Sequence, residues 1–220
     1  MACIATLNIN GINDQNKQLQ LIDFVNTHNI DILMLQEHNL KSLDNIHHLF
    51  NSYFHIYVNP TINSKGGTAI IIKRSLPITV IDLENSADGR IMSLRILYCN
   101  QELHILNIYA HSGNNFINER EHLFQNEILY YLRHNLSKTI IGGDWNCIIS
   151  KNDSTTNNCH MSKALTTLVR ELRLKDAWFI KKRKKWNKLV CKINFQCKNY
   201  SHKPLRPFMC KCNHKHSGNA

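Results

Sequence analysis

The sequence contains no long apolar run. Its longest apolar stretches, residues 30–35 and 68–72, fall far below the roughly 18 residues that a membrane-spanning helix requires. Near residue 1 it also shows no basic segment followed by a long apolar run, the pattern of a secretory signal peptide. These absences predict an intracellular protein without a membrane segment.

Paired CxxC spacings are absent as well. Four of the eight cysteines are scattered over the first 160 residues, and the others gather near the end with three histidines: Cys191, Cys197, Cys210, Cys212, His202, His214 and His216. These side chains could bind zinc, but their spacing matches no paired zinc motif, so a zinc site is the less favoured alternative. A secreted disulfide scaffold is not indicated, and we expect a reducing compartment.

No acidic residue follows Asp176. Residues 181–220 hold 12 Lys and Arg side chains, whereas residues 1–180 carry 15 against 16 Asp and Glu. The formal net charge of +11 therefore belongs to the end of the chain. This division predicts a near-neutral domain over residues 1–178 and a basic, cysteine-rich extension over residues 179–220, which we expect to be disordered. The extension is either a solvated end or an arm that contacts nucleic acid.

Strand and helix patterns alternate through the first 178 residues. A chain of 220 residues can bury one full core. Apolar runs predict strands over residues 3–9, 30–36, 69–73, 78–83, 89–98, 103–109 and 139–141, and apolar stripes of helical period predict helices over residues 15–28, 118–134 and 162–174. We therefore expect an α/β fold with mixed strands and no internal repeat.

Polar residues stand where four of these strands end. The segments are Thr6-Leu7-Asn8-Ile9-Asn10-Gly11, Leu33-Met34-Leu35-Gln36-Glu37, Leu106-Asn107-Ile108-Tyr109-Ala110 and Ile140-Ile141-Gly142-Gly143-Asp144-Trp145-Asn146. In layered α/β proteins, sites assemble where strands end and loops begin. The four segments thus predict one polar cleft.

Each candidate in this cleft has a plainer alternative. Glu37 suits Mg²⁺, which needs one or two carboxylates, but it could also be a surface carboxylate. Asp144 and Asn146 would point the same way on an extended segment, so the carboxylate could accept a proton from water while the amide donates to a phosphoryl oxygen. The alternative for this Gly-rich segment is a simple turn.

Three further side chains complete the set of candidates. Tyr109 is either a half-buried sheet aromatic or, by its place at a strand end, a phosphate-binding group. Asn8 and Asn10 could orient a ligating carboxylate or bind metal-held water. An Asx turn before Gly11 is the competing explanation for these two residues.

The motifs occur in a recognisable order. They are Leu7-Asn8-Ile9-Asn10-Gly11, Leu35-Gln36-Glu37, Gly66-Gly67-Thr68-Ala69-Ile70, Asn107-Ile108-Tyr109-Ala110 and Gly142-Gly143-Asp144-Trp145-Asn146. This ordered set resembles the endonuclease/exonuclease/phosphatase superfamily, and within it the apurinic-type endonuclease domain of non-LTR (LINE-type) retrotransposons. The resemblance covers residues 3–178, including the Asp176-Ala177-Trp178 ending. It implies a layered α/β sandwich of mixed sheets, as in DNase I.

The resemblance also implies roles for the candidate residues. Asn8, Asn10 and Glu37 would lie on the metal side of the cleft, Tyr109 would contact the scissile phosphate, and Asp144 with Asn146 would position and activate water. The implied reaction is hydrolysis of a DNA phosphodiester with Mg²⁺, or Mn²⁺ in its place, leaving a 3′ hydroxyl. A monomer that acts on DNA in the nucleus is the corresponding expectation.

The sequence departs from this family near its end. His38 and His111 stand where Thr and Pro are common, which are minor changes. After Trp178, however, the family's late Tyr-Thr, Arg-Ile-Asp and Ser-Asp-His segments are not found. The resemblance therefore implies a fold that is incomplete at the C-terminus and an activity that is weakened or lost. The alternatives are a non-catalytic remnant that binds nucleic acid through its basic tail, and a relative of repair apurinic endonucleases or small-molecule phosphodiesterases.

The basic tail gives a first testable prediction. Lys181, Lys182, Arg183, Lys184 and Lys185 precede Trp186, so positive charge and a ring that can stack on bases occur together. Neutralising these five residues should flatten the dependence of log K on log salt for duplex DNA by about 0.9 per lost phosphate contact. A salt titration of DNA binding by the full chain and by a fragment ending at residue 178 measures this. If the full chain and the fragment bind DNA with equal affinities and equal salt slopes, the basic tail does not bind DNA. The remaining interpretations of the tail are then a nuclear-import patch or a solvated segment.

Overall fold

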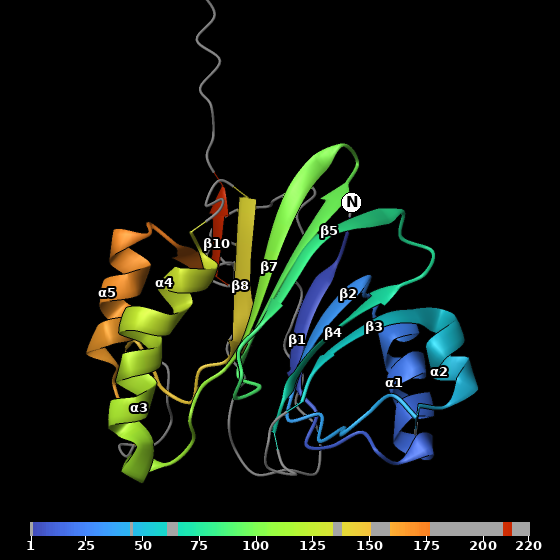
Figure 1. Cartoon of the computed structure of the whole chain (residues 1–220), viewed down its shortest axis with the longest axis horizontal. Coiled ribbons are helices and arrows are strands. Elements are labelled where there is room, and N and C mark those ends of the chain that lie inside the picture. Colours follow the sequence, from blue (N-terminus) through green and yellow to red (C-terminus); the bar gives the residue numbers. More distant parts are fainter. Residues whose placement is uncertain are drawn as a thin grey trace, which may run out of the picture.

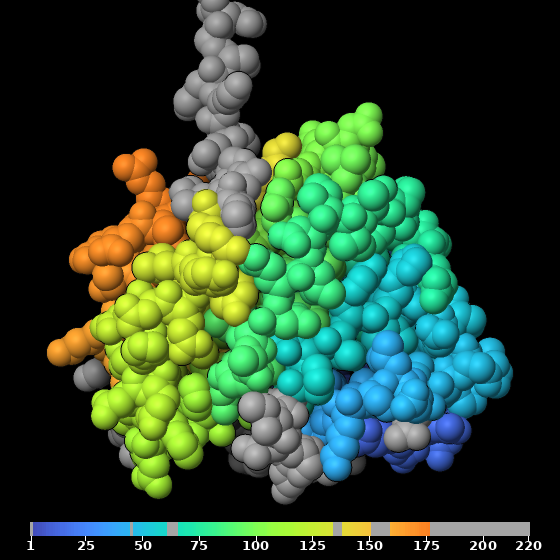
Figure 2. Space-filling view, in the orientation of Figure 1, coloured from blue at the N-terminus to red at the C-terminus, as the bar shows by residue number. Residues whose placement is uncertain are grey.

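Two β-sheets lie face to face and carry helices on their outer surfaces (Figure 1). This computed structural model describes residues 2–44, 46–60, 66–133, 138–150, 159–176 and 209–212. In the space-filling view, the cyan residues, from the part of the chain that forms the first sheet, pack directly against the green residues from the middle of the chain (Figure 2). The layered α/β arrangement of mixed sheets expected from the sequence is confirmed.

The first sheet has four strands in the order β1-β2-β4-β3. β1 pairs with β2 in parallel, and β4 runs antiparallel to both β2 and β3. Helices α1 and α2 cover its outer face (Figure 1). The elements are β1 (Ile4–Asn8), α1 (Gln15–Thr27), β2 (Ile32–Gln36), α2 (His48–Tyr53), β3 (Phe54–Asn59) and β4 (Thr68–Lys73).

The second sheet has six strands in the order β5-β6-β7-β8-β10-β9. β7 and β8 are parallel, while β5, β6 and β7 form an antiparallel meander. Helices α3, α4 and α5 cover its outer face (Figure 1). The elements are β5 (Ile78–Asn85), β6 (Ile91–Tyr98), β7 (Gln101–Tyr109), a 3₁₀ turn (Asn114–Phe116), α3 (Ile117–His122), a π-helical turn (Leu123–Glu127), α4 (Ile128–Tyr131), β8 (Lys138–Asp144), α5 (Lys163–Glu171), β9 (Lys175–Asp176) and β10 (Met209–Cys212).

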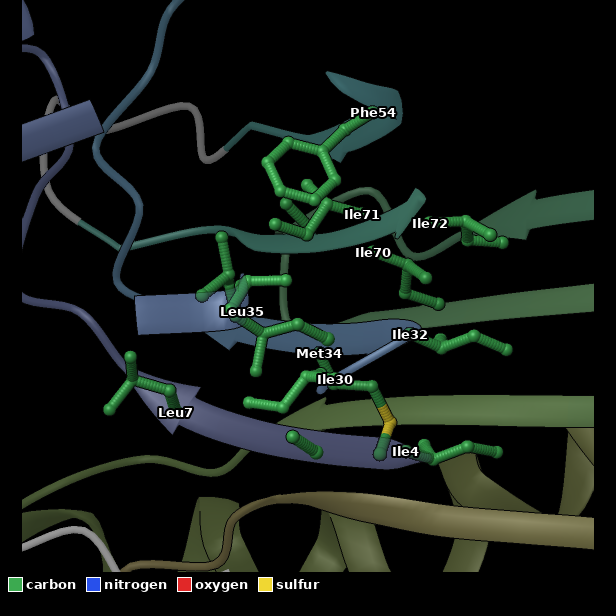
Figure 3. Packing of buried hydrophobic residues seen from close by; sticks show 14 of the residues in the cluster. Ile4, Leu7, Ile30, Ile32, Met34, Leu35, Phe54, Ile70, Ile71 and Ile72 are labelled. Carbon is green, nitrogen blue, oxygen red and sulfur yellow. The ribbon is translucent and has the colours of Figure 1, made fainter. Parts of the chain in front are cut away.

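Two apolar clusters hold these layers together. The first fills the space between the sheets and extends under α1 and α2, and Figure 3 shows part of it, including Met34, Leu35 and Ile70. The second lies between the second sheet and α3 to α5 and includes Phe124 and Leu165. Each fully buried aliphatic or aromatic side chain stabilises the fold by about 1.5–3 kcal/mol, so these clusters supply most of the driving force for folding.

Several elements differ from the sequence-based expectation. α2 and β3 were not anticipated, and the helix expected over residues 118–134 is interrupted by a π-helical turn. β8 continues through Gly142 and Gly143 to Asp144, so these glycines belong to a strand rather than to a turn. Within the extension expected to be disordered, Met209–Cys212 forms β10 between β8 and β9. Residues 177–208 and 213–220 lie outside the described part of the chain.

Membrane-spanning helices were also considered. Across the described residues, no helix is long and apolar enough to cross a bilayer.

Gly143 allows β8 to approach β7, and this gives a second prediction. Its φ is +146°, and a Cβ here would overlap with the Ile108 carbonyl on β7. Gly143→Ala should therefore lower the free energy of unfolding by about 3 kcal/mol or more. The matched control is Gly113→Ala, because Gly113 also has a positive φ (+86°) but its Cβ would lie 4.0 Å from Phe116. The control should lose only about 1–2 kcal/mol. Equal losses in urea unfolding would contradict this role of Gly143.

Candidate active site

The ends of four strands meet at one edge of the paired sheets. Asn8 ends β1 and Tyr109 ends β7, while Glu37 directly follows β2 and Asp144 ends β8. Because β1 and β2 are parallel, as are β7 and β8, their carboxyl ends lie at the same edge of each sheet. The structure therefore brings together the side chains of these four residues, as the sequence analysis expected.

The side-chain amide of Asn8 joins the two halves of this site. Its Nδ2 donates to Glu37 Oε1 at 2.8 Å and to Asp144 Oδ2 at 3.0 Å. An amide nitrogen carries two hydrogens, so it can satisfy both carboxylates at once. The Glu37 carboxylate of the first sheet and the Asp144 carboxylate of the second sheet are thus held by the same nitrogen atom of Asn8. One or two carboxylates are what a hard cation such as Mg²⁺ needs from a protein.

Tyr109 lies beside both carboxylates. Burial raises the pKa of Tyr109, and the negative charge of Glu37, a hydrogen bond with its carboxylate and the charge of Asp144 raise it further, while Arg90 acts in the opposite direction. The hydroxyl group is therefore protonated at neutral pH. Its hydrogen is donated to Glu37 in this structure and could be donated to a phosphoryl oxygen instead when a substrate binds.

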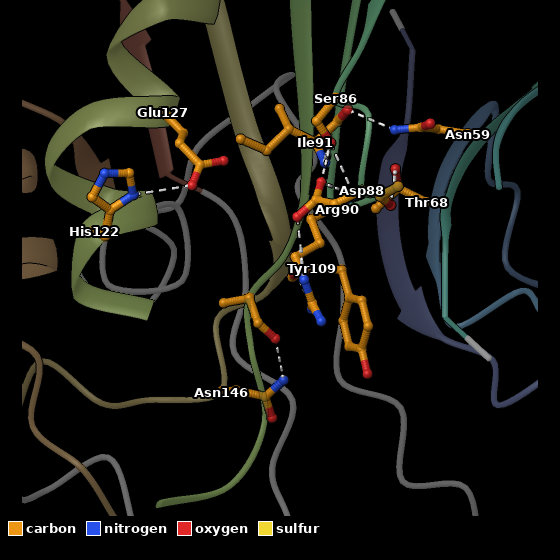
Figure 4. A network of polar contacts seen from close by, with 12 residues as sticks. Asn59, Thr68, Ser86, Asp88, Arg90, Ile91, Tyr109, His122, Glu127 and Asn146 are labelled. Carbon is orange, nitrogen blue, oxygen red and sulfur yellow. Dashed lines mark hydrogen bonds and ion pairs between the residues drawn. The ribbon is translucent and has the colours of Figure 1, made fainter. Parts of the chain in front are cut away.

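Asp144 and Asn146 are arranged differently from the prediction. The strand ends at Asp144, and Asn146 has a left-handed φ of +47°, so the segment is not extended and the argument from alternation was wrong. The backbone N–H of Asn146 donates to Asp144 Oδ1 at 3.1 Å. The side-chain Nδ2 of Asn146 donates to the Ala110 carbonyl at 2.9 Å, the bond drawn at Asn146 in Figure 4. Asn146 therefore fixes the Asp144 carboxylate through its backbone, and one hydrogen of its amide remains for another acceptor.

Asn10 takes part through its backbone. Its N–H donates to Asn8 Oδ1 at 3.2 Å, which fixes the orientation of the Asn8 amide. Its carbonyl accepts from Lys17 Nζ at 3.0 Å, and the same ammonium donates to the Ile9 carbonyl at 2.6 Å. Lys17 on α1 was not singled out from the sequence, because its partners are backbone atoms that follow a different element.

Arg90 is a second residue that the sequence analysis missed. Its Nη1 donates to the Tyr109 carbonyl at 3.2 Å, and its guanidinium carbon lies 5.2 Å from the centre of the Tyr109 ring. Asp88 and Ser86 hold the turn, with Asp88 Oδ2 3.4 Å from Arg90 Nε and Ser86 Oγ accepting from the Arg90 N–H at 3.0 Å. Figure 4 shows the side chains of Arg90 and Tyr109 next to each other. The sequence could have indicated Arg90, because in an antiparallel pair the turn before β6 must lie at the same edge as the end of β7.

Several site residues adopt a left-handed backbone. Glu37 has a φ of +55°, and Asn10 and Asn146 have φ values of +49° and +47°. This conformation costs a non-glycine residue about 1–2 kcal/mol, and such strain clusters at functional sites. Backbone bonds hold Glu37 in place, because its N–H donates to the Gly67 carbonyl at 2.9 Å and its carbonyl accepts from the Gly11 N–H at 2.6 Å.

His38 supports the same loop from inside the protein. It is fully buried, and its Nδ1 accepts from the Leu40 N–H at 2.9 Å while Nε2 faces the Asn59 carbonyl at 3.3 Å. Burial lowers the pKa of His38, so the ring is neutral. A Cβ on Gly67 would overlap with this ring, which explains why glycine is needed there. The departure at His38 is thus accommodated by packing.

The remaining predicted residues lie elsewhere. Lys181, Lys182, Arg183, Lys184 and Lys185 fall outside the described residues. Within the described part of the chain, no three His, Cys, Asp or Glu side chains gather in a way that could hold a metal ion. Any cation at this site would therefore rely on Glu37 and Asp144, with water completing its coordination.

Comparison with known proteins agrees with this architecture. The structure is similar to that of an AP endonuclease from Archaeoglobus fulgidus, with a TM-score of 0.66, 16% identity and coverage of 96% of this chain and 87% of that one. It is also similar to a truncated Caenorhabditis elegans TDP2, with a TM-score of 0.59, 18% identity and coverage of 96% and 83%. At these identities the similarity shows the fold. The sequence model of the Endonuclease/Exonuclease/phosphatase family matches residues 5–180, and the chain belongs to this family.

Proposed function

We propose that this protein is a Mg²⁺-dependent DNA endonuclease of the non-LTR retrotransposon type. One observation carries the proposal: Asn8 holds Glu37 and Asp144 together at the edge where Tyr109 and Arg90 also lie. Carboxylates, a protonated hydroxyl and a guanidinium are the groups that hydrolysis of a phosphodiester needs. Membership of the family supports phosphodiester hydrolysis as the reaction class.

The pair of carboxylates at this site fits a hard divalent cation. Mg²⁺ in proteins is bound by one or two carboxylates and keeps its other positions for water and phosphate oxygens. Glu37 would hold it on the side of the first sheet, with Asn8 orienting the Glu37 and Asp144 carboxylates and the Asn10 N–H orienting Asn8. When bound, the ion supplies positive charge that polarises the phosphoryl group.

The protein's own groups divide the remaining work. The Asp144 carboxylate, fixed by Asn8 and by the Asn146 N–H, is placed to accept a proton from an attacking water. The Arg90 guanidinium lies over the Tyr109 ring, and this guanidinium and the Tyr109 hydroxyl can compensate charge that develops on the phosphoryl oxygens. The second hydrogen of the Asn146 amide can serve the same purpose.

Sequence features favour the retrotransposon type and a weakened activity. Leu7-Asn8-Ile9-Asn10-Gly11 and Asp176-Ala177-Trp178 resemble that group, but residues 179–220 contain no Ser-Asp-His segment. The resemblance implies that the histidine of this segment contacts the scissile phosphate in family members, so without it charge in the transition state would be compensated only in part. We therefore expect slow turnover by the 220-residue chain.

A repair apurinic endonuclease is the second candidate. The observation that favours it is the fold shared with the A. fulgidus AP endonuclease.

A non-catalytic, DNA-binding remnant would instead depend on the basic tail. Asp176 at the end of β9 and Met209 at the start of β10 are paired, and both lie level with Ile141 on β8. The basic run would therefore be attached on both sides to the sheet that carries Asp144.

Metal binding by the cleft is the third prediction. At a Mg²⁺ concentration about 100 times the dissociation constant, the ion should raise the free energy of unfolding by about 2.7 kcal/mol. Glu37→Gln should lose most of this increment, because it removes a charge from the carboxylate pair. Glu102→Gln is the matched control, since Glu102 pairs with Arg95 on the second sheet. Urea unfolding with Mg²⁺ or EDTA measures the increment, and equal increments in both variants would contradict the site.

Plasmid nicking is the fourth prediction. A longer chain in which the family's late segments follow residue 178 should nick supercoiled DNA with Mg²⁺, and Asp144→Ala should slow it by about 10²- to 10⁴-fold. Asp23→Ala, at an exposed position on α1, is the control and should leave the rate unchanged.

Three outcomes would overturn parts of this proposal. Nicking by the Asp144→Ala variant at the parental rate would remove Asp144 from the mechanism. Rapid nicking by the unmodified 220-residue chain, abolished by EDTA and by Glu37→Ala, would show that the late segments are dispensable. Cleavage confined to abasic DNA would favour the repair enzyme.

A further inference from the structure

A buried asparagine connects the two sheets just behind the site. Asn107 on β7 has no exposed surface. Its Nδ2 donates to the carbonyls of Leu35 at 2.9 Å and Ala69 at 2.8 Å, which belong to the first sheet, and its Oδ1 accepts from Gln36 Nε2 at 2.6 Å. The amide of Asn107 therefore spans the apolar space between the sheets and contacts both β2 and β4.

The orientation of this amide is fixed by its partners. Carbonyl oxygens only accept hydrogen bonds, so the nitrogen of Asn107 must face Leu35 and Ala69 and its oxygen must face Gln36. Leu35 and Ala69 are directly paired across β2 and β4. One side chain of the second sheet thus fits a single place between two strands of the first.

Gln36 extends the connection to β1. Its Nε2 also donates to Thr6 Oγ1 at 2.9 Å, and both side chains are buried. Thr6 lies two residues before Asn8, and Asn107 lies two residues before Tyr109, so each pair points to the same face of its strand. Gln36 directly precedes Glu37. The three polar side chains therefore form a layer immediately beneath the candidate active site.

Two further bonds continue this layer toward Arg90. Asn59 Nδ2 donates to the Ile91 carbonyl at 2.9 Å, and Thr68 Oγ1 donates to the Gly89 carbonyl at 3.2 Å. Figure 4 shows Asn59 and Thr68 facing the turn that carries Arg90. The first sheet thereby also holds the residues on either side of Arg90.

Apolar packing alone would not fix this relation. The hydrophobic effect between the sheets is non-directional, so burial of apolar surface does not by itself specify one register of the two sheets. A sliding movement at Asn107 would instead break several buried hydrogen bonds and leave their groups unpaired, which is costly. The polar layer therefore selects one relative position of the two sheets.

We propose that Gln36 and Asn107 are positioning residues that hold the sheets where Glu37 and Asp144 both reach Asn8. The inference rests on the proposed function for its catalytic consequence, but its geometric content is independent of it. In the clamp formed by Thr6, Gln36 and Asn107, loss of a member loosens the contact between Asn8 and Asp144. We then expect kcat to fall while KM changes little, because the clamp residues themselves do not touch the substrate.

The test uses the full chain and a matched pair of threonines. Thr6→Val removes a hydroxyl from the clamp, and Asn107→Leu removes its centre. Thr139→Val is the control, because Thr139 is equally buried but contacts His104 within the second sheet, at 3.4 Å. Near-ultraviolet circular dichroism and urea unfolding establish that each variant is folded.

The main readout is hydrogen exchange of the Asn8 side-chain amide, followed by nuclear magnetic resonance. It should become about tenfold faster in Asn107→Leu, rise by a smaller factor in Thr6→Val, and stay within about twofold of the parent in Thr139→Val. Nicking by the same proteins should show kcat falling by about tenfold in Asn107→Leu with KM nearly unchanged.

The outcomes separate this inference from the proposed function. Unchanged Asn8 exchange in folded Thr6→Val and Asn107→Leu, or an equal change in Thr139→Val, would overturn the clamp. Faster exchange in the two clamp variants alone supports it, even if the parent chain does not nick DNA. In that case the clamp stands, and the proposed function fails only if the longer chain with the family's late segments also does not nick DNA.

Discussion

The contact of one amide nitrogen with two carboxylates is the interaction on which the site depends. Asn8 ends a strand of the first sheet, Glu37 follows the neighbouring strand, and Asp144 ends a strand of the second sheet. The contact forms only if both sheets present parallel strands that end at the same edge. It also requires the sheets to lie at one separation. The apolar core stabilises the packing of the two sheets, and the buried amides of Gln36 and Asn107 fix the position of one sheet relative to the other.

The backbone around this contact is strained and well supported. Glu37 and Asn146 adopt left-handed conformations that cost free energy, yet both are held by hydrogen bonds from neighbouring strands and loops. Gly67 and Gly143 permit the close approaches that this support requires. Such an arrangement keeps two negative groups together before any cation binds. The packing of the rest of the fold thus offsets the free-energy cost of holding the two carboxylates together at the site.

Much of this arrangement could be predicted from the sequence. Asn8, Glu37, Tyr109 and Asp144 were found because each follows an apolar strand, and strand ends converge in layered α/β folds. β3 was missed because it is an edge strand with several half-exposed residues, which weakens its pattern. β10 was missed because its partners, β8 and β9, precede it by more than 30 residues. Arg90 was missed because its role depends on where a hairpin turn lies, which periodicity does not reveal.

The central claim is that a divalent cation binds where the two sheets meet at Asn8. Paramagnetic broadening by substoichiometric Mn²⁺ tests it most directly, because broadening falls off steeply with distance from the ion. The side-chain amide signals of Asn8 and Asn146 and the backbone signal of Ala110 should broaden first. The signals of Cys99 and Asn100, in the turn between β6 and β7 at the other end of the second sheet, should stay sharp. Broadening that begins elsewhere, or that affects both ends equally, would contradict the account.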